Sequence, residues 1–324
     1  MPQSRKSQVS LADTSYYHCI SRCVRRAYLC GEDKLTGQNY EHRRQWVEDK
    51  ILFLTQVFAI DVCAYSIMNN HTHIVLYVDA KAIETWSTRD ILNRWHRLFK
   101  GTLLTQDFVN NKPLDDSQLL TVEQTASVYK KRLIDISWFM RILNECIARK
   151  ANKEDKCTGR FWEGRFKSQA LLDEAALMAC MAYVELNPIR AKIATTPETS
   201  DYTSIKLRIQ KAPRNEQPAT LMPFVGNQRK CMTKGLPFEL KDYIDLVDLT
   251  GRSLKDGKRG FINNQLPDIL KRLNISAGNW LTISKQFTKV FHGAVGTAQV
   301  LTEFNDRQHK KRRCNISNIQ KLFA

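Results

Sequence analysis

The segment from residue 59 to residue 78 constrains the fold most, because it contains two strand-like runs separated by a tight turn. Ala59 to Ile67 and Thr72 to Val78 are rich in β-branched and aromatic residues, which favour strands. Met68-Asn69-Asn70 lies between them, and asparagine tolerates the backbone conformations that tight turns require. The pattern predicts two strands joined by a short turn, and therefore a fold that contains an antiparallel sheet.

The segments on either side of this hairpin extend the prediction to an α+β domain. Residues 16–24 alternate and branch like a strand, and residues 40–58 place apolar side chains at helical spacing. The remaining elements are expected as helices at 82–99 and 136–151, a strand at 166–172, and a helix that Asp173 caps and that ends before Pro188. The order β-α-β-β-α-β predicts a ferredoxin-like antiparallel sheet with helices packed on one face.

Two regions differ in composition from this domain. Gly101 to Ser127 is polar and carries Asn110-Asn111-Lys112-Pro113, so we expect an insertion or mobile excursion at about 101–127. Beyond Tyr202 the chain becomes richer in loops and basic residues, which predicts a first domain at 1–210 and a basic, mainly helical, DNA-associated extension at 211–324. The helix candidates of the extension are 236–249, 266–273 and 280–291, and a basic cluster at 307–313 suits phosphates or forms a solvated tail.

The charge of the chain indicates a polyanionic partner. Lys and Arg number 50 against 33 Asp and Glu, a net charge of +17, which favours nucleic acid although anionic membranes also attract basic proteins. No apolar run approaches the roughly 20 residues of a membrane span, and the first residues lack the apolar centre of a secretory signal. We therefore expect a cytoplasmic protein without a membrane partner. The nine cysteines are expected to be reduced thiols, with Cys19 and Cys23 more often buried small residues than zinc ligands.

Histidines at the start of the second hairpin strand suggest a metal site. On a strand, residues i and i+2 point to the same side, so His71 and His73 aim two imidazoles at one point. On a helix, residues i and i+4 are neighbours, so Tyr183 and Asn187 would present a phenol and an amide oxygen together. A His-His-Asn site is compatible with Mg²⁺ or Mn²⁺. If the two elements face each other, the ion and a tyrosine nucleophile share one pocket.

Helical geometry predicts that Tyr183 and Asn187 need not be core residues. At 100° per residue its apolar stripe consists of Leu177, Cys180, Met181 and Val184. Tyr183 and Asn187 then lie together on a flank beside Ala176, outside the stripe. Taken singly, each residue also has a plainer interpretation: a buried strand histidine with an exposed neighbour, a core tyrosine, and an asparagine that ends a helix.

The combination suits cleavage of a phosphodiester bond. A divalent ion neutralises the phosphate and stabilises the leaving oxygen, and a tyrosine can attack if nearby positive charge or a base assists it. Attack by Tyr183 would conserve the bond energy in a phosphotyrosine. Candidate DNA contacts are Arg160, Arg165 and Lys167, interleaved with Phe161, Trp162 and Phe166, together with Arg22, Arg190 and Lys192. The alternative is that these aromatic side chains fill the core and only the charges face solvent.

Four segments resemble one known family. They are Tyr17-His18-Cys19-Ile20-Ser21-Arg22, Met68-Asn69-Asn70-His71-Thr72-His73, the run from Gly159 to Ser168 (GRFWEGRFKS), and the run from Tyr183 to Ala191 (YVELNPIRA). With these landmarks, residues 15 to 208 resemble the REP-associated tyrosine transposases, relatives of the single-tyrosine HUH transposases. Two features depart from the family pattern: Thr72 stands where a hydrophobic residue is usual, and the loop at 101–127 is long.

The resemblance implies an enzyme for DNA transposition and recombination. It implies that His71 and His73 hold Mg²⁺ or Mn²⁺, that Asn187 is a third ligand, and that Tyr183 is the nucleophile. Such enzymes cut single-stranded DNA at hairpins of REP elements, join the 5′ phosphate through a phosphotyrosine intermediate and leave a free 3′ hydroxyl. Members include monomers and dimers, so a homodimer is possible. The competing interpretations are a non-catalytic hairpin-DNA-binding regulator and an RNA-binding module of the same fold.

Overall fold

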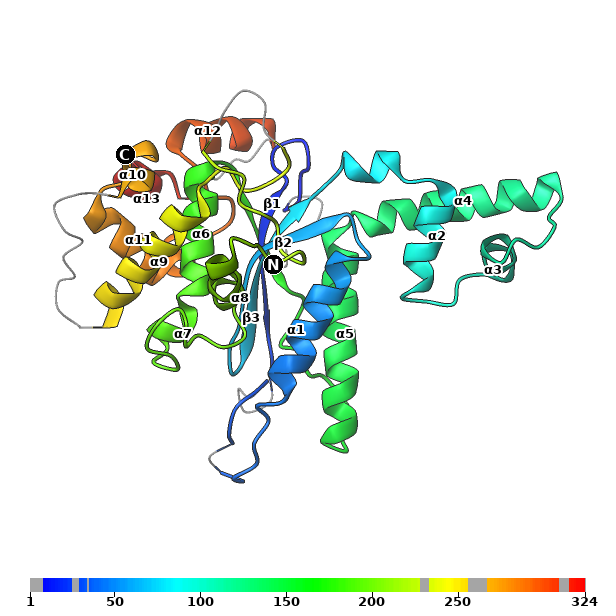
Figure 1. Cartoon of the computed structure of the whole chain (residues 1–324), viewed down its shortest axis with the longest axis horizontal. Helices are drawn as coiled ribbons and strands as arrows, with labels where there is room; N and C mark the ends of the chain where they lie inside the picture. Colours follow the sequence, from blue (N-terminus) through cyan, green and yellow to red (C-terminus); the bar gives the residue numbers. More distant parts are fainter. Residues whose placement is uncertain are drawn as a thin grey trace.

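A computed structural model describes residues 8–24, 29–33, 35–227, 233–255, 267–308 and 315–323 of the chain. Four strands form one sheet: β1 (Tyr16–Arg22), β2 (Ile60–Ile67), β3 (His71–Val78) and β4 (Lys167–Leu171). Their order is β2-β3-β1-β4, and every neighbouring pair is antiparallel. The predicted hairpin is confirmed, and the Met68 N–H closes its turn by donating to the carbonyl of His71 at 2.9 Å. The α+β class is therefore confirmed (Figure 1).

Helices account for most of the remaining described chain. Those before the last strand are α1 (Arg43–Thr55), the 3₁₀ helix η2 (Ala82–Thr85), α2 (Thr88–His96), α3 (Leu103–Val109), α4 (Asp116–Leu133) and α5 (Ile136–Glu154). Those after it are α6 (Glu174–Glu185), α7 (Asn187–Arg190), α8 (Ser204–Lys211), the 3₁₀ helix η3 (Ala212–Arg214), α9 (Leu240–Lys255), α10 (Asp268–Arg272), α11 (Ala277–Val290), α12 (Ala298–Arg307) and α13 (Ile316–Leu322).

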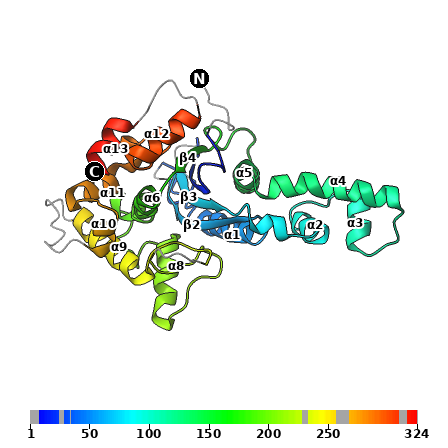
Figure 2. The same ribbon diagram turned by 90° about the horizontal axis from the view of Figure 1, so that it is seen from above.

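Helices cover both faces of the sheet, so the expectation of helices on one face was wrong. Alternate residues of β3 divide between the two sides, because successive strand side chains point in opposite directions. Ile74, Leu76 and Val78 pack in a core with α1 and α5, whereas Val75 packs in a second core with α6. Viewed from above, α6 and the C-terminal helices lie on one side of the strands and α1 and α5 on the other (Figure 2).

Burial of α6 on every side also corrects the predicted amphipathic stripe. Asp173 caps this helix as expected, its side chain accepting from the N–H of Ala176 at 2.9 Å. All its residues from Ala175 to Glu185 are buried, because α11 and α9 cover the side that the sheet leaves free. The helix ends before Pro188, also as expected. Asn187 begins the separate helix α7 after a break at Leu186, so Tyr183 and Asn187 do not share one continuous helix.

The predicted excursion at 101–127 is helical rather than irregular. Thr102 and Asp115 form capping boxes at the starts of α3 and α4, where their side chains accept backbone N–H groups. Together with α2, these helices form an arm that projects from the body of the molecule (Figure 1). The core positions of α4 recur at helical spacing, and they are Val122, Ala126, Tyr129 and Leu133.

The C-terminal helices pack against α6 and share its core. The candidate at 266–273 corresponds to α10, although residue 266 lies outside the described residues, as do residues 309–313 of the predicted basic cluster. In the described ranges no helix has both the length and the apolar character needed to cross a bilayer. Cys19 and Cys23 are both buried, which agrees with the preference for small core residues over zinc ligands.

Candidate active site

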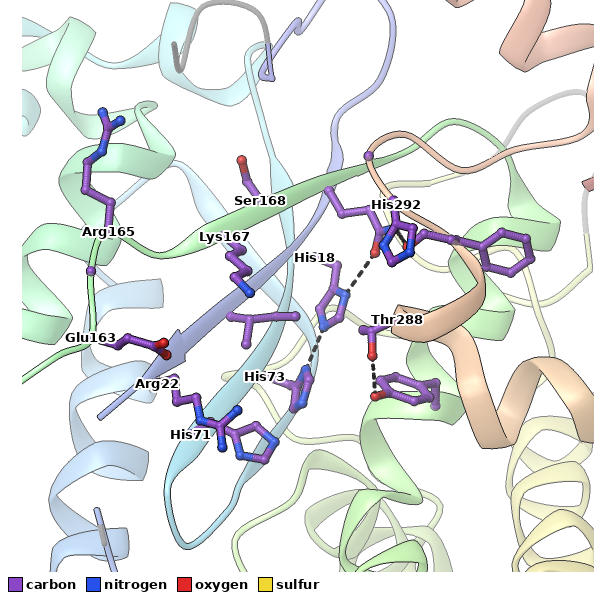
Figure 3. Close-up of a pocket in the computed structure, with 16 residues that line it drawn as sticks. His18, Arg22, His71, His73, Glu163, Arg165, Lys167, Ser168, Thr288 and His292 are labelled. Atoms are coloured by element: carbon purple, nitrogen blue, oxygen red, sulfur yellow. Dashed lines mark hydrogen bonds between the residues drawn. The ribbon is translucent and has the colours of Figure 1, made fainter. Parts of the chain in front are cut away.

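Strand alternation gathers the candidate residues on the face of the sheet that meets α6. The register pairs Arg22 of β1 with His71 of β3, and Ile20 with His73. His18, two residues earlier on β1, pairs with Gln169 of β4. Since residues two apart on a strand point the same way, one face carries the imidazoles of three histidines. These side chains line a cavity of about 640 Å³, and Figure 3 shows them converging in it.

A chain of hydrogen bonds fixes the tautomer of His73. The Gln169 amide Nε2 donates to the carbonyl of Phe291 at 3.0 Å, so its Oε1 faces His18 Nδ1 at 3.3 Å as an acceptor. His18 Nδ1 must then carry a proton, which leaves His18 Nε2 as the acceptor toward His73 Nδ1 at 2.9 Å. The proton of His73 therefore sits on Nδ1, and its Nε2 keeps a free lone pair.

The same arrangement recurs at His71. Its Nδ1 lies 2.5 Å from Oδ1 of Asn70, an oxygen that can only accept, so Nδ1 carries the proton and Nε2 is free. The rings of His71 and His73 have centroids 4.8 Å apart. Imidazoles that bind metals usually donate the other ring N–H to an acceptor in this way, which fixes the ring and the tautomer.

Burial keeps these histidines neutral at physiological pH. Desolvation is the main cause at each site, since it penalises the charged imidazolium. It lowers the pKa of His18 and of His71 to about 4. Burial, with the other two histidines and Arg190 as smaller causes, holds the pKa of His73 well below its usual range. A neutral imidazole is the form that binds a metal ion.

Tyr183 reaches the same cavity from α6. Its side chain is 8% exposed and its ring centroid lies 5.7 Å from that of His73. The phenolic oxygen is 2.8 Å from the hydroxyl oxygen of Thr288 on α11, within hydrogen-bond distance (Figure 3). The ring itself packs on Phe287, with centroids 5.7 Å apart. The ring is therefore part of the α6 core, while Tyr183 also lines the cavity beside the histidines.

Arg190 holds the other side of the tyrosine. Its guanidinium carbon lies 3.8 Å from the centre of the Tyr183 ring. The group is fixed by hydrogen bonds to the carbonyls of Tyr183 and Ser284 and to Oδ1 of Asn187, at 2.6, 2.9 and 2.9 Å. Burial lowers the pKa of Arg190 to about 10, so the guanidinium is still charged at pH 7. It places a positive charge directly beside the phenol.

The rim of the cavity is basic. Arg22, Arg165 and Lys167 line it and are exposed, and Glu163 contributes one negative charge. Cationic side chains at the rim favour a polyanion, since they interact with its phosphates. Of the predicted DNA contacts, these three basic residues lie at the cavity.

The other predicted site residues are not among the residues that line the cavity. Asn187 offers its Oδ1 to Arg190, and its Nδ2 has no hydrogen-bond partner among the described residues. Trp162 is half-buried and donates its indole N–H to the Asn144 carbonyl at 2.8 Å, while its neighbours Phe161 and Phe166 are buried. Arg160 and Lys192 are exposed elsewhere, and Arg190 stacks on the tyrosine. The core interpretation thus holds for both phenylalanines.

The donor set fits a divalent ion in part. His71 and His73 both offer a neutral Nε2 with no hydrogen-bond partner in the described chain, as two ligands should. Asn187, the expected third ligand, is not among the residues that line this cavity. Over the described ranges, no group of three or more His, Cys, Asp or Glu side chains has the arrangement of a complete metal site. Two protein ligands leave open positions for phosphate oxygens and water, which Mg²⁺ and Mn²⁺ readily accept.

Several residues of the site had no assigned role in the sequence. Gln169 and Thr288 belong to β4 and α11, and nothing local in the sequence connects either residue to the histidines. His18 precedes Arg22 by four residues on a predicted strand, so the sequence places both side chains on one face. Its place between His73 and Gln169 depends on the strand register, which sequence spacing does not define.

Comparison with known proteins yields one structural likeness. No protein-family model and no curated protein matches the chain. Among solved structures, the chain is similar to one described as "Structure of the REP associates tyrosine transposase bound to a REP hairpin". The match covers 74% of this chain and 98% of that chain, with 10% sequence identity and a TM-score of 0.38.

Proposed function

We propose that the chain is a metal-dependent DNA strand transferase that cuts single-stranded or hairpin DNA and joins itself to the strand through Tyr183. One observation carries the proposal: the tyrosine and the open Nε2 atoms of His71 and His73 meet in one basic cavity. The sequence motifs that resemble REP-associated tyrosine transposases agree with it. The strand order β2-β3-β1-β4, all antiparallel, supports a ferredoxin-like fold whose second face is covered by the C-terminal helices.

The cleavage step exchanges one phosphodiester for another. The oxygen of Tyr183 forms a bond to phosphorus while the bond between phosphorus and the 3′ oxygen breaks. The phenolic proton passes to solvent, and the leaving 3′ oxygen takes a proton from solvent. Mg²⁺ or Mn²⁺ on His71 and His73, when bound, supplies charge neutralisation at the phosphate and at the leaving oxygen. The bond energy is kept in the phosphotyrosine, so a 3′ hydroxyl can reverse the step.

The surrounding residues prepare the tyrosine for this step. Arg190 sits over the ring, where its charge would stabilise negative charge that develops on the phenolic oxygen. Thr288 fixes the direction of the hydroxyl. Arg22, Arg165 and Lys167 at the rim would hold the phosphates on either side of the cut.

A non-catalytic hairpin binder is the second candidate, and one observation favours it. The hydroxyl of Tyr183 is engaged by Thr288, and Oδ1 of Asn187, the expected ligand oxygen, accepts a hydrogen bond from Arg190. A regulator that kept the fold and the charge would bind the same DNA without forming a covalent bond.

A covalent adduct assay separates the two candidates. Labelled palindromic single-stranded DNA is incubated with the protein and Mn²⁺, and conjugates are detected on a denaturing gel. The transferase should give an adduct that Tyr183→Phe abolishes, while DNA binding by that variant stays close to wild type. Binding without any adduct would support the regulator, and an undiminished adduct in Tyr183→Phe would reject Tyr183 as the nucleophile.

A further inference from the structure

The base of the helical arm carries a second groove, on the side of the sheet away from Tyr183. It lies between α2, α4 and α5 and has a volume of about 370 Å³. Its aromatic lining residues are Trp95, Phe99, Tyr129 and Trp138, and its charged ones are Arg132, Arg141 and Glu145. Figures 1 and 2 show this position, where the arm leaves the body next to α5.

The aromatic rings form one continuous stack that reaches the surface. Trp95 stacks on Tyr129 with ring centroids 4.4 Å apart, and both are buried. Phe99 extends the stack from Trp95 at 5.0 Å and is 43% exposed. Trp138, half-buried, meets Trp95 edge-on at 5.6 Å. The buried rings of Trp95 and Tyr129 therefore support those of Phe99 and Trp138, which solvent or a ligand can reach.

Arg132 is the charged centre of the groove. Its guanidinium carbon lies 4.5 Å from the ring centre of Trp138 and within 6 Å of those of Trp95 and Tyr129. It has neither an acidic partner nor a side-chain hydrogen bond in the described ranges of the chain. Arg141, 64% exposed at its side chain, lies over the same Trp138 ring at 5.0 Å. The arginine charges beside these rings would repel a cationic ligand. They favour a ligand that combines a planar ring with an anionic group.

One stretch of chain connects this groove to the tyrosine cavity. Glu163 and Arg165 line that cavity. The neighbouring Trp162 donates a hydrogen bond from its indole N–H to the carbonyl of Asn144 on α5. Asn144 is followed by Glu145, which lines the groove and forms ion pairs with Arg141 and with the exposed Arg149 on the outer face of α5. From Asn144 to Trp138 is about 9 Å along the helix, at 1.5 Å per residue. A strand leaving the cavity can therefore reach the groove along a surface with several basic side chains.

We propose that the groove at the base of the arm binds an unpaired base of a single-stranded DNA tail, with Phe99 and Trp138 as stacking partners and Arg132 as the phosphate contact. This inference rests on the proposed DNA-processing function. It adds a second contact outside the tyrosine cavity, which would hold the strand that flanks the cut site. Stacking of this kind tolerates any base, so the contact contributes affinity for single strands rather than sequence preference.

Photo-cross-linking of the wild-type protein tests the contact directly. The probe is oligo(dT) that carries 5-iodo-deoxyuridine, irradiated in complex with the full chain and analysed by peptide mass spectrometry. Cross-links at Phe99 or Trp138 are expected, because the halogenated base reacts with an aromatic ring in contact with it. Cross-links confined to the residues of the tyrosine cavity would overturn the proposal.

A pair of charge-removing variants tests its energetic contribution. Binding is compared for an oligonucleotide with and without a single-stranded tail of about ten nucleotides, the size of a typical single-strand site. The tail should improve wild-type affinity about tenfold, the effect of one stacked base with its phosphate. Arg132→Gln should lose this gain and still bind the untailed probe like wild type. Lys131→Gln, which removes the same charge from an exposed position next to Arg132 on α4 and outside the groove lining, should keep the gain.

The measurements separate this inference from the proposed function. The same binding comparison is repeated in the Tyr183→Phe background without divalent ions, where it does not depend on cleavage. A tail effect that needs Arg132, found without any covalent adduct in wild type, would uphold the groove and reject the strand transferase. If wild type formed an adduct on untailed DNA and the tail did not improve binding, the strand transferase would be upheld and the groove contact rejected. Loss of the tail effect in Lys131→Gln as well would reduce the contact to general charge and reject the proposal.

Discussion

The two faces of the central sheet use the same strands for different purposes. Toward α1 and α5, β3 presents Ile74, Leu76 and Val78 to an apolar core. Toward α6, the same strand presents His71 and His73 to a basic cavity. Cover by helices is common to both faces, so burial alone does not distinguish them. The difference is that the α6 face has a chain of polar hydrogen bonds and a cavity. This cavity lies where β1 ends and β3 begins.

Removal of a cavity histidine should have the largest effect on activity. In His71→Ala one of the two open Nε2 donors is lost, so Mn²⁺ binding should weaken and adduct formation should fall by about a hundredfold or more. Isothermal titration with Mn²⁺ and the adduct assay measure the two effects.

The matched variant on the opposite face is Leu76→Ala. It should cost about 2–5 kcal/mol of unfolding free energy, the usual range for a buried leucine, and leave the adduct rate of the folded fraction unchanged. If His71→Ala and Leu76→Ala impaired adduct formation equally, the proposal that only the α6 face takes part in the reaction would be wrong.

Gln169 offers a sharper test of the polar face, because it acts on His73 only through His18. Gln169→Leu removes the acceptor that fixes the tautomers, so Mn²⁺ affinity should fall by about tenfold, as for other partners of metal ligands. Gln169→Glu keeps an acceptor for His18 and should bind Mn²⁺ more tightly than Gln169→Leu. The nitrogen-15 NMR chemical shifts of His73 report its tautomer independently of catalysis. Identical shifts in the two variants would contradict the chain of hydrogen bonds from Gln169 through His18 to His73.

Variants of Thr288 test whether its hydrogen bond to Tyr183 speeds adduct formation. Thr288→Val keeps the shape but removes the hydroxyl, and one hydrogen bond contributes about 1 kcal/mol, so adduct formation should slow by about fivefold. Thr288→Ser, which keeps the hydroxyl, should behave like wild type. A faster reaction in Thr288→Val would show that the contact restrains Tyr183 instead of orienting it.

The sequence revealed the parts of this site that depend on local periodicity. Two-residue alternation placed His71 and His73 on one face, and Asp173 and Pro188 marked the ends of the tyrosine helix. Sequence periodicity failed for the supposedly free flank of α6, because α9 and α11, which are distant in the sequence, bury it. It also did not reveal the break at Leu186, which places Tyr183 and Asn187 on two successive helices. Polar composition concealed α4, whose core positions extend past residue 127 to Leu133.

The buried histidines predict how stability depends on pH. In the unfolded chain their pKa is about 6.5, whereas burial lowers the pKa of His18 and His71 to about 4 in the folded protein. Between these values the unfolded state binds more protons, so the free energy of unfolding should fall as pH drops from about 6.5 toward 4. Thermal melts across this range measure the slope. His18→Asn should make it shallower, and an unchanged slope would contradict the assignment to His18.

Thr72 provides the smallest and most specific test of the comparison, because it lies between His71 and His73 and alternates to the apolar face. Its side chain is 1% exposed, and its hydroxyl oxygen has no hydrogen-bond partner in the described chain. Thr72→Val replaces the hydroxyl by a methyl group of similar size, so it should stabilise the fold by about 1 kcal/mol and leave adduct formation unchanged. Val75→Thr makes the reverse exchange in the core beneath α6, where Val75 is fully buried, and should destabilise by a similar amount. Urea unfolding measures both, and a loss of activity in Thr72→Val would mean that the apolar face takes part in the chemistry after all.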